Sequence, residues 1–291
     1  MQKLEVTPND FGSRFLNGDF SAIYQQTTEE FKQLATLEQF IEYGESFNNG
    51  VETYSLEMST NLNKYITQYL WLDNEREKAI GISFDENNTI YGISLAPFVS
   101  FPESDQQYTK NTYIMPIKEE WFVFWGGTNQ FINYHYVYAD QRYAYDLIIM
   151  KDGQSYSGPV KENESYYAFN KEIIAPAEGK IVKIVDGIKD NVPGEFNPEP
   201  PEGNCVIIEH KNNEYSMLAH LKQSSILVSE GDFVQQGEVI GVCGNSGNSS
   251  EPHLHFQVMN SINYLKGQSI RIRFENGLEP IQGDFVSPFA S

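Results

Sequence analysis

The stretch that most constrains this chain is EPHLHFQV at residues 251–258, which places His253 and His255 two positions apart in a chain of five histidines. Side chains alternate faces along a β-strand, so both imidazoles would point one way, with Leu254 and Phe256 on the opposite side. Neighbouring imidazoles repel when protonated and compete for partners when neutral, unless a metal ion or proton transfer uses them. The pattern therefore predicts a strand with a histidine site on one face.

The composition indicates a globular protein and excludes several classes of partner. The 291 residues are 40% hydrophobic and 14% aromatic, enough for the core of one large domain or two ordinary ones. Twenty basic against forty acidic residues give a net charge of −20, which repels phosphate backbones, so we expect no nucleic-acid partner. The longest apolar runs, such as WFVFW at 121–125, are far shorter than the roughly 20 residues of a transmembrane segment.

The N-terminus and the two cysteines leave the cellular compartment open. The first residues, MQKLEVTPND, have no basic flank leading into an apolar stretch and no small-residue cleavage site, so no signal peptide is visible. Either the protein is cytoplasmic or a leader was removed. We predict Cys205 and Cys243 as two small core residues, and a disulfide between them stays open.

Residues 10–98 are predicted to form a small α+β module. A capping-box pattern from Thr36 to Gln39 and helical hydrophobic spacing indicate two or three short helices. The runs YITQYLWLD, REKAIGISFD and TIYGISLAPF then predict strands. Helices followed by such a meander resemble the nuclear-transport-factor-2-like superfamily, and this resemblance carries no catalytic residue to the chain.

The rest of the chain is predicted as a linker at 99–118 and a mainly antiparallel β domain at 119–291. The linker has a polar centre between two prolines. Turn compositions at AEGK (177–180), KNNE (211–214) and QQGE (235–238) suggest paired strands. Residues 187–204 are rich in proline and glycine and predict an exposed loop of the kind that often borders a site.

All five histidines lie in this second region, and the candidate site gathers residues from separate predicted strands. His220 lies near the end of EYSMLAHL, and Asp146 lies within RYAYDLII. Catalytic zinc sites keep three nitrogen or oxygen ligands from the protein and leave a fourth position to water. One carboxylate and several histidines meet that requirement. His210, beside the KNNE turn, is predicted as a surface residue.

Several ordered motifs resemble the lysostaphin/LytM-type zinc metallopeptidases. The resemblance covers about residues 128–262 and is carried by IIAPAEGKIVKIVDG, GNCVIIEH, YSMLAHL and VSEGDFVQQGEVIGVCGNSGNSSEPHLHFQV. It implies a largely antiparallel sheet with a groove, a bound Zn²⁺, and hydrolysis of the peptide part of bacterial peptidoglycan. It also implies an extracytoplasmic protein, secreted or at the cell surface.

The resemblance further implies roles for individual residues. Asp146 and His255 match zinc ligands, while His220 and His253 match catalytic histidines that hold the attacking water, stabilise the oxyanion and pass a proton to the leaving amine.

The third zinc ligand departs from the family pattern H-x-x-x-D. Arg142 stands four residues before Asp146, and a guanidinium cannot lose its proton to bind zinc. We therefore predict His135, 11 residues before Asp146, as the third ligand, across a hairpin turning near Ala139 and Asp140.

Two alternatives compete with a zinc endopeptidase. In the first, Arg142 fills the metal position, and the protein binds cell-wall peptide or regulates a hydrolase without cutting. In the second, the protein binds or hydrolyses carbohydrate, which would need a pair of carboxylates set against exposed aromatic residues, and no ordered motif selects such a pair.

Overall fold

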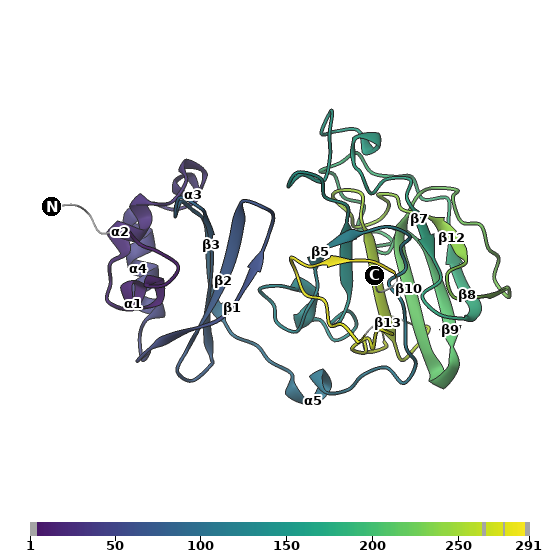
Figure 1. The fold of residues 1–291 in the computed structure, drawn as a ribbon, viewed down its shortest axis with the longest axis horizontal. Helices are drawn as coiled ribbons and strands as arrows, with labels where there is room; N and C mark the ends of the chain where they lie inside the picture. The colour runs from purple at the N-terminus through teal and green to yellow at the C-terminus, as the bar shows by residue number, and fades with distance from the viewer. Residues whose placement is uncertain (1–4, 264–265, 276, 289–291) are drawn as a thin grey trace. The chain divides into compact units, whose positions relative to one another are not determined.

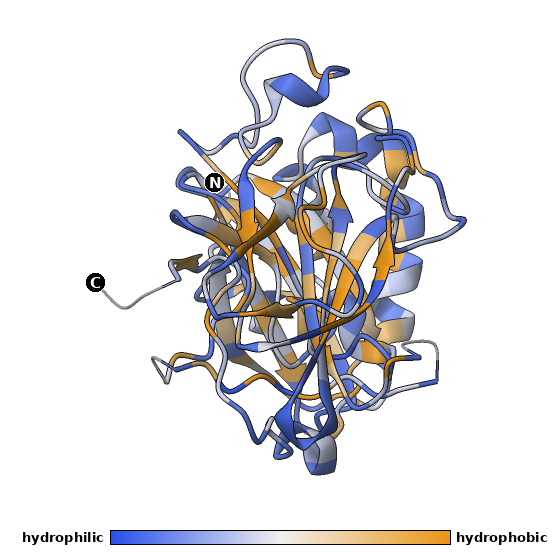
Figure 2. Ribbon diagram, turned by 90° about the vertical axis from the view of Figure 1, so that its right-hand side faces the viewer, coloured by the Kyte–Doolittle hydropathy of each residue, from blue (hydrophilic) through white to orange (hydrophobic). Residues whose placement is uncertain are grey.

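The computed structural model describes residues 5–263, 266–275 and 277–288, and the chain divides into two units, Met1–Val99 and Ser100–Ser291. Each unit has a hydrophobic core of its own. The strands carry much of the hydrophobic sequence, and the outer loops are hydrophilic (Figure 2). Among the helices of the described residues, none has the length and hydrophobicity that crossing a bilayer requires.

The first unit packs four short helices against one face of a four-stranded antiparallel sheet (Figure 1). The core between them is rich in aromatic rings in edge-to-face contact, such as Phe15 on Phe20 and Phe20 on Phe40. The strands follow the order β1-β2-β3-β4. The elements are α1 (Phe11–Leu16), α2 (Phe20–Gln25), α3 (Glu29–Leu34), α4 (Leu37–Phe47), β1 (Tyr54–Asn61), β2 (Ile66–Asp73), β3 (Lys78–Asp85) and β4 (Ile90–Pro97).

The sequence predicted most of this unit. The capping box is confirmed: Thr36 accepts a hydrogen bond from the backbone of Gln39, whose side chain accepts one in return. The three predicted strands are also confirmed, as β2, β3 and β4. Strand β1 was missed, because most of its side chains are exposed and its polar sequence SLEMSTN hides the alternation. The resemblance to the nuclear-transport-factor-2-like superfamily stays a prediction.

The second unit is mainly antiparallel β, as predicted, with few helical turns (Figure 1). An eight-stranded sheet has the order β11-β8-β9-β10-β13-β6-β5-β14, and β12 pairs with β7 separately. The helical turns are α5 (Pro102–Asp105), η1 (Tyr134–Val137), η2 (Asn163–Ser165) and η3 (Lys211–Asn213). The strands are β5 (Trp121–Trp125), β6 (Tyr145–Ile148), β7 (Glu172–Ile174), β8 (Gly179–Val185), β9 (Asn204–His210), β10 (Glu214–Leu221), β11 (Phe233–Val234), β12 (Val239–Val242), β13 (Leu254–Met259) and β14 (Phe285–Val286).

Of the three predicted turns, only KNNE closes a hairpin, between β9 and β10. The AEGK turn leads from β7 to β8, but β7 pairs with β12 and β8 with β9 and β11. The QQGE turn likewise joins β11 to β12, which lie in different sheets. Turn composition shows where a chain reverses, and it does not show which strands hydrogen-bond afterwards.

The segment predicted as a linker packs against the second unit. Tyr113, Met115 and Ile117 are buried in its core. The buried carboxylate of Glu214 accepts hydrogen bonds from the Asn111 backbone at 3.1 Å and from the Tyr113 hydroxyl at 2.9 Å. The polar groups at the centre of the predicted linker are therefore hydrogen-bonded to a distant acidic side chain. The second unit includes this segment.

Strands β10, β13 and β6 lie side by side at the centre of the sheet and present two different faces. Leu218, Leu254 and Leu147 point into the main core. On the opposite face, Ala219 of β10 is paired with His255 of β13, and His255 is paired with Asp146 of β6. The antiparallel register thus sets the side chains of three strands beside one another.

Two irregular segments, 187–203 and 244–250, are joined by backbone hydrogen bonds next to this face. Asn197 donates to Gly247 at 3.0 Å and Asn191 to Asn245 at 2.8 Å. Gly247 has a φ of +76°, and a Cβ there would lie 2.4 Å from the backbone nitrogen of Gly203. Glycine is required here both by the backbone conformation and by the close approach.

We predict that Gly247→Ala destabilises the second unit more than Gly231→Ala. Both glycines have positive φ, but a Cβ on Gly231 meets nothing within 4 Å. The control should therefore cost only the left-handed conformation, about 1–2 kcal/mol, whereas the Gly247 variant also pushes the two segments apart. Scanning calorimetry measures the transition of this unit, and equal shifts in the two variants would contradict the crowding argument.

Candidate metal centre

The site is built around the carboxylate of Asp146, which lies on β6 between two histidines. Oδ2 lies 3.0 Å from Nε2 of His135, and Oδ1 lies 2.9 Å from Nδ1 of His255. All three side chains are buried, and their ligand atoms lie within 4.8 Å of one another. His255 reaches Asp146 through direct cross-strand pairing, so the sheet itself sets that half of the cluster.

His135 reaches the cluster from the 3₁₀ turn η1 and not from a strand of a hairpin, which corrects our prediction. The chain does turn at Ala139 and Asp140 before entering β6. Asn133 caps η1 by accepting from the His135 backbone at 3.1 Å, and its amide donates to the Ala144 carbonyl at 3.2 Å. The capping side chain thereby ties the turn to the residues just before Asp146.

His220 and His253 lie beside this cluster and contact each other. Their ring centroids are 4.6 Å apart, and those of His220 and His255 are 5.9 Å apart. His220 Nδ1 donates to the Ser246 carbonyl and His253 Nδ1 to the Glu251 carbonyl, both at 2.8 Å. Each ring is thus anchored through Nδ1. The Nε2 atom of His253 lies 3.9 Å from Asp146.

A local irregularity turns His220 toward the site. On a regular strand it would alternate with Ala219 and point into the core with Leu218. The pairing of β10 with β9 shifts register between Leu218 and Leu221, and His220 has a φ of +61°. Bulges of this kind re-aim side chains, and a non-glycine residue in this conformation stores about 1–3 kcal/mol of strain.

The electrostatics of the cluster favour an ionised carboxylate and a neutral His220. Burial would raise the pKa of Asp146, but the charges of His135 and His253 and the hydrogen bonds from His135 and His255 hold it well below its usual range. Burial, reinforced by the charges of His253 and His255, lowers the pKa of His220 well below its usual value. Burial opposes protonation of His255 as well, yet its hydrogen bond and attraction to Asp146 raise its pKa.

The donor set fits a transition-metal ion. Two imidazole nitrogens and one carboxylate oxygen from three separate segments match the three-ligand pattern of catalytic zinc sites, in which water takes the fourth position. An ionised, buried carboxylate between two imidazoles is the charge arrangement that a divalent cation needs. The neighbouring His220 and His253 could exchange protons with a water at the open position.

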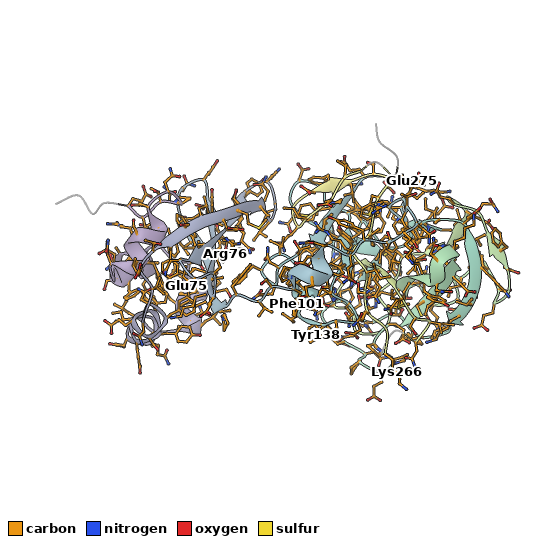
Figure 3. The ribbon with its side chains drawn as sticks, turned by 90° about the horizontal axis from the view of Figure 1, so that it is seen from below. Glu75, Arg76, Phe101, Tyr138, Lys266 and Glu275 are labelled. Atoms are coloured by element: carbon orange, nitrogen blue, oxygen red, sulfur yellow. The ribbon has the colours of Figure 1, made fainter. Side chains whose placement is uncertain are left out.

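Arg142 is engaged outside this cluster. Its guanidinium lies 3.4 Å from the ring centroid of Phe101, a residue of the second unit that Figure 3 labels. It also donates to the Tyr136 carbonyl at 3.0 Å and to the Ser104 hydroxyl at 3.1 Å. None of these partners is a cluster residue, so this geometry gives no support to the alternative in which Arg142 replaces the metal.

The prediction that His210 lies at the surface is wrong. The residue is buried, and its ring nitrogens contact the Glu178 carbonyl and the Ser216 hydroxyl, both at 2.8 Å. Tyr113, from the segment predicted as linker, packs edge-on against this ring. The predicted core cysteines are both buried and free, and burial raises the pKa of Cys205 to about 12.

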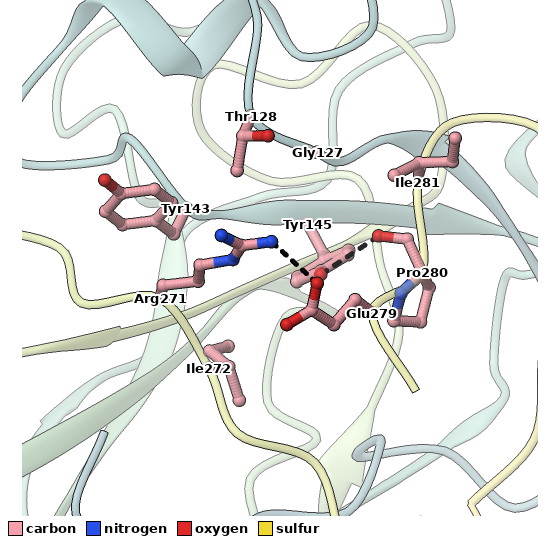
Figure 4. A pocket seen from close by; sticks show the side chains of 9 residues that line it. All are labelled: Gly127, Thr128, Tyr143, Tyr145, Arg271, Ile272, Glu279, Pro280 and Ile281. Atoms are coloured by element: carbon pink, nitrogen blue, oxygen red, sulfur yellow. Dashed lines mark hydrogen bonds and ion pairs between the residues drawn. The ribbon is translucent and has the colours of Figure 1, made fainter. Parts of the chain in front are cut away.

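A small pocket of about 60 Å³ is lined by Tyr145, which neighbours Asp146 on β6 and therefore faces the other side of the sheet. Figure 4 shows the residues that line it. Arg271 and Glu279 form an ion pair of 2.7 Å inside it, and the Tyr145 hydroxyl donates to the Pro280 carbonyl at 3.1 Å. The hydroxyl of Tyr143, which also lines the pocket, contacts Ser104 and Asp105. These polar groups therefore take part in the hydrogen bonding of the domain.

Sequence reasoning missed two glutamines that touch the cluster. Gln141 Oε1 lies 2.8 Å from Nδ1 of His135, and Gln257 Oε1 lies 3.0 Å from Nε2 of His255. Gln257 follows His255 by two on the same strand, so alternation could have placed it on the site face. The sequence has no comparable signal for Gln141, which lies in a turn.

A model of a known family matches part of the second unit. Residues 165–271 match the model of Peptidase family M23. The peptidoglycan DD-endopeptidase ShyA of Vibrio cholerae is 42% identical over 60 residues, 21% of this chain and 14% of that protein. The DD-carboxypeptidase/endopeptidase Mpg of Neisseria meningitidis is 46% identical over 55 residues, 19% of this chain and 12% of that protein.

The matches to these two relatives cover only a small part of this chain and of each relative. The chain spans less than a fifth of the length of these two relatives. Among solved structures, the catalytic domain of the antimicrobial peptidase lysostaphin from Staphylococcus simulans is 28% identical, covering 40% of this chain and 86% of that one with a TM-score of 0.27. The family match includes His220, His253 and His255 but begins after His135 and Asp146. The similarity to Peptidase family M23 is thus confined to residues 165–271, a part of the second unit.

Proposed function

We propose that this protein is a zinc-dependent endopeptidase that cleaves peptide bonds in the peptide part of bacterial peptidoglycan. The observation that carries the proposal is the convergence of three buried ligand residues, His135, Asp146 and His255, beside two histidines that are each anchored through Nδ1. The match to Peptidase family M23 and the names of the relatives supply the reaction class and the substrate class.

In this proposal His135, Asp146 and His255 hold the metal ion. Bound zinc would polarise the scissile carbonyl and increase the acidity of water at the open position. The ionised Asp146 contributes a negative charge at the centre of the cluster, and the sheet register keeps it against His255.

His220 and His253 would move the protons. Because Nδ1 of each ring donates to a backbone carbonyl, the lone pair on Nε2 is available to accept a proton from the attacking water. The lowered pKa of His220 keeps that ring neutral before the reaction. A protonated imidazole can then stabilise the developing oxyanion and donate to the leaving amine.

The names of the relatives support the proposed substrate and location. Peptidoglycan peptides lie outside the cytoplasmic membrane, so we propose an extracytoplasmic protein, secreted or at the cell surface. The net charge of −20 argues against nucleic acid as a partner. The alternative of an inactive binding protein assumed that Arg142 fills the metal position. The stacking of its guanidinium on Phe101 gives that assumption no support.

We expect purified protein to bind about one zinc per chain, and His135→Ala to lose most of it. The matched control is His210→Gln, which replaces a buried histidine whose partners lie outside the cluster. Elemental analysis after zinc loading and gel filtration measures the metal. A His135 variant that keeps its zinc would refute this ligand, and an unloaded parent would refute the zinc enzyme.

We expect His220→Gly to retain zinc and the fold while peptidoglycan hydrolysis falls by roughly 10²–10⁴-fold. Glycine adopts the left-handed conformation at this position freely, so the unfolding temperature should not drop through the backbone. Release of soluble fragments from purified peptidoglycan gives the rate. Hydrolysis at the parental rate would remove His220 from the mechanism.

A further inference from the structure

Each histidine of the metal cluster is held at both ring nitrogens. One nitrogen of His135 faces Asp146, and the other donates to Gln141 at 2.8 Å. His255 repeats this arrangement, with Asp146 on one side and Gln257 at 3.0 Å on the other. A hydrogen bond to the distal nitrogen sets both the rotation of the ring and the nitrogen that keeps its lone pair for a metal.

Both glutamines are connected to one turn, residues 139–143. Gln141 belongs to this turn, and its backbone donates to the Tyr138 carbonyl at 3.1 Å. The Gln257 amide donates to the Asp140 carbonyl at 3.1 Å. The dipeptide Asp140–Gln141 therefore lies behind both histidines and connects the outer contacts of one ligand to those of the other.

The turn is fixed by its other neighbours. Arg142 bonds the Tyr136 carbonyl of η1 and stacks on Phe101, while its own carbonyl accepts from Asn133 at 3.3 Å. The carboxylate of Asp105 accepts from the hydroxyls of Tyr136 and Tyr143, both at 2.8 Å. A turn held on both sides can orient the side chain that it carries.

We propose that Gln141 is a positioning residue that orients the His135 ring for metal binding; this rests on the proposed zinc function. Asp146 and His255 lie on neighbouring strands whose register sets their distance, but His135 lies on a short 3₁₀ turn outside the sheet. Its ring therefore depends on a side-chain partner, which Gln141 supplies. Outer partners of metal-binding histidines affect metal affinity without touching the metal.

The test compares zinc affinity in Gln141→Leu, Gln141→Glu and the parent, by competition with a chromophoric zinc chelator. The leucine variant loses the acceptor and should raise the Kd for zinc roughly 10–100-fold. The glutamate variant keeps an acceptor oxygen and should bind at least as tightly as the parent. Gln235→Leu is the control, because Gln235 is exposed at a turn between β11 and β12.

A second readout separates positioning from a general structural role. The absorption spectrum of Co²⁺-loaded protein reports ligand geometry, so it should change in Gln141→Leu and match the parent in Gln141→Glu. The unfolding temperature of the metal-free leucine variant should stay near that of the parent, since the backbone bonds of the turn remain.

The outcomes distinguish the inference from the function on which it rests. If the parent binds zinc through His135 but Gln141→Leu binds it equally well with an unchanged Co²⁺ spectrum, the positioning role is wrong and the zinc site stands. If the leucine variant loses affinity only together with its folded state, or glutamate fails to restore affinity, positioning is also wrong. If the parent itself binds neither ion, the proposed function fails and the inference fails with it.

Discussion

The structure of the site depends on one buried charge, the carboxylate of Asp146. An ionised carboxylate removed from water is costly unless charges and hydrogen bonds compensate it. Here His135 and His255 lie within 3.0 Å of its two oxygens, and together with the charge of His253 they keep its pKa low although the group is buried. The neighbouring elements position the two histidines against this carboxylate. The sheet register supplies His255, and the capped turn η1 supplies His135.

Strain is stored beside this carboxylate and is balanced by hydrogen bonds. His220 leaves the ladder of β10 in a left-handed conformation, but its backbone donates to the Glu202 carbonyl and accepts from Gly244. Those two partners come from the segments 187–203 and 244–250. The glycines that let these segments approach each other therefore hold the bonds that keep a strained histidine in place. The packing of these two segments therefore helps to orient His220, a proposed proton carrier.

The segment before the β domain takes part in the same support. Phe101 and Asp105 contact the turn that carries Gln141 and the helical turn that carries His135, while Tyr113 packs on His210. A region with the composition of a linker thus stabilises the turn that carries His135, the proposed ligand whose spacing departs from that of the resembled family. Phe101 of this segment is also the residue on which the guanidinium of Arg142 stacks. Arg142 stands at the position where the resembled family has a histidine.

Periodicity and motif order were enough to predict the mainly antiparallel second unit, three strands of the first unit, the capping box at Thr36, and the position of His253 and His255 on one side of the chain. These features depend on local alternation and on neighbours in sequence. The exposed strand β1, the partners of β7 and β12, the packed segment at 100–117 and the burial of His210 could not be predicted, because each depends on a contact with a residue far away in the chain. His135 was predicted as a ligand because it is the nearest histidine upstream of Asp146 and Arg142 stands where the resembled family has a histidine. Only the tertiary structure placed it 3.0 Å from Asp146, with Gln141 behind it, since a 3₁₀ turn has no register that a sequence pattern reveals.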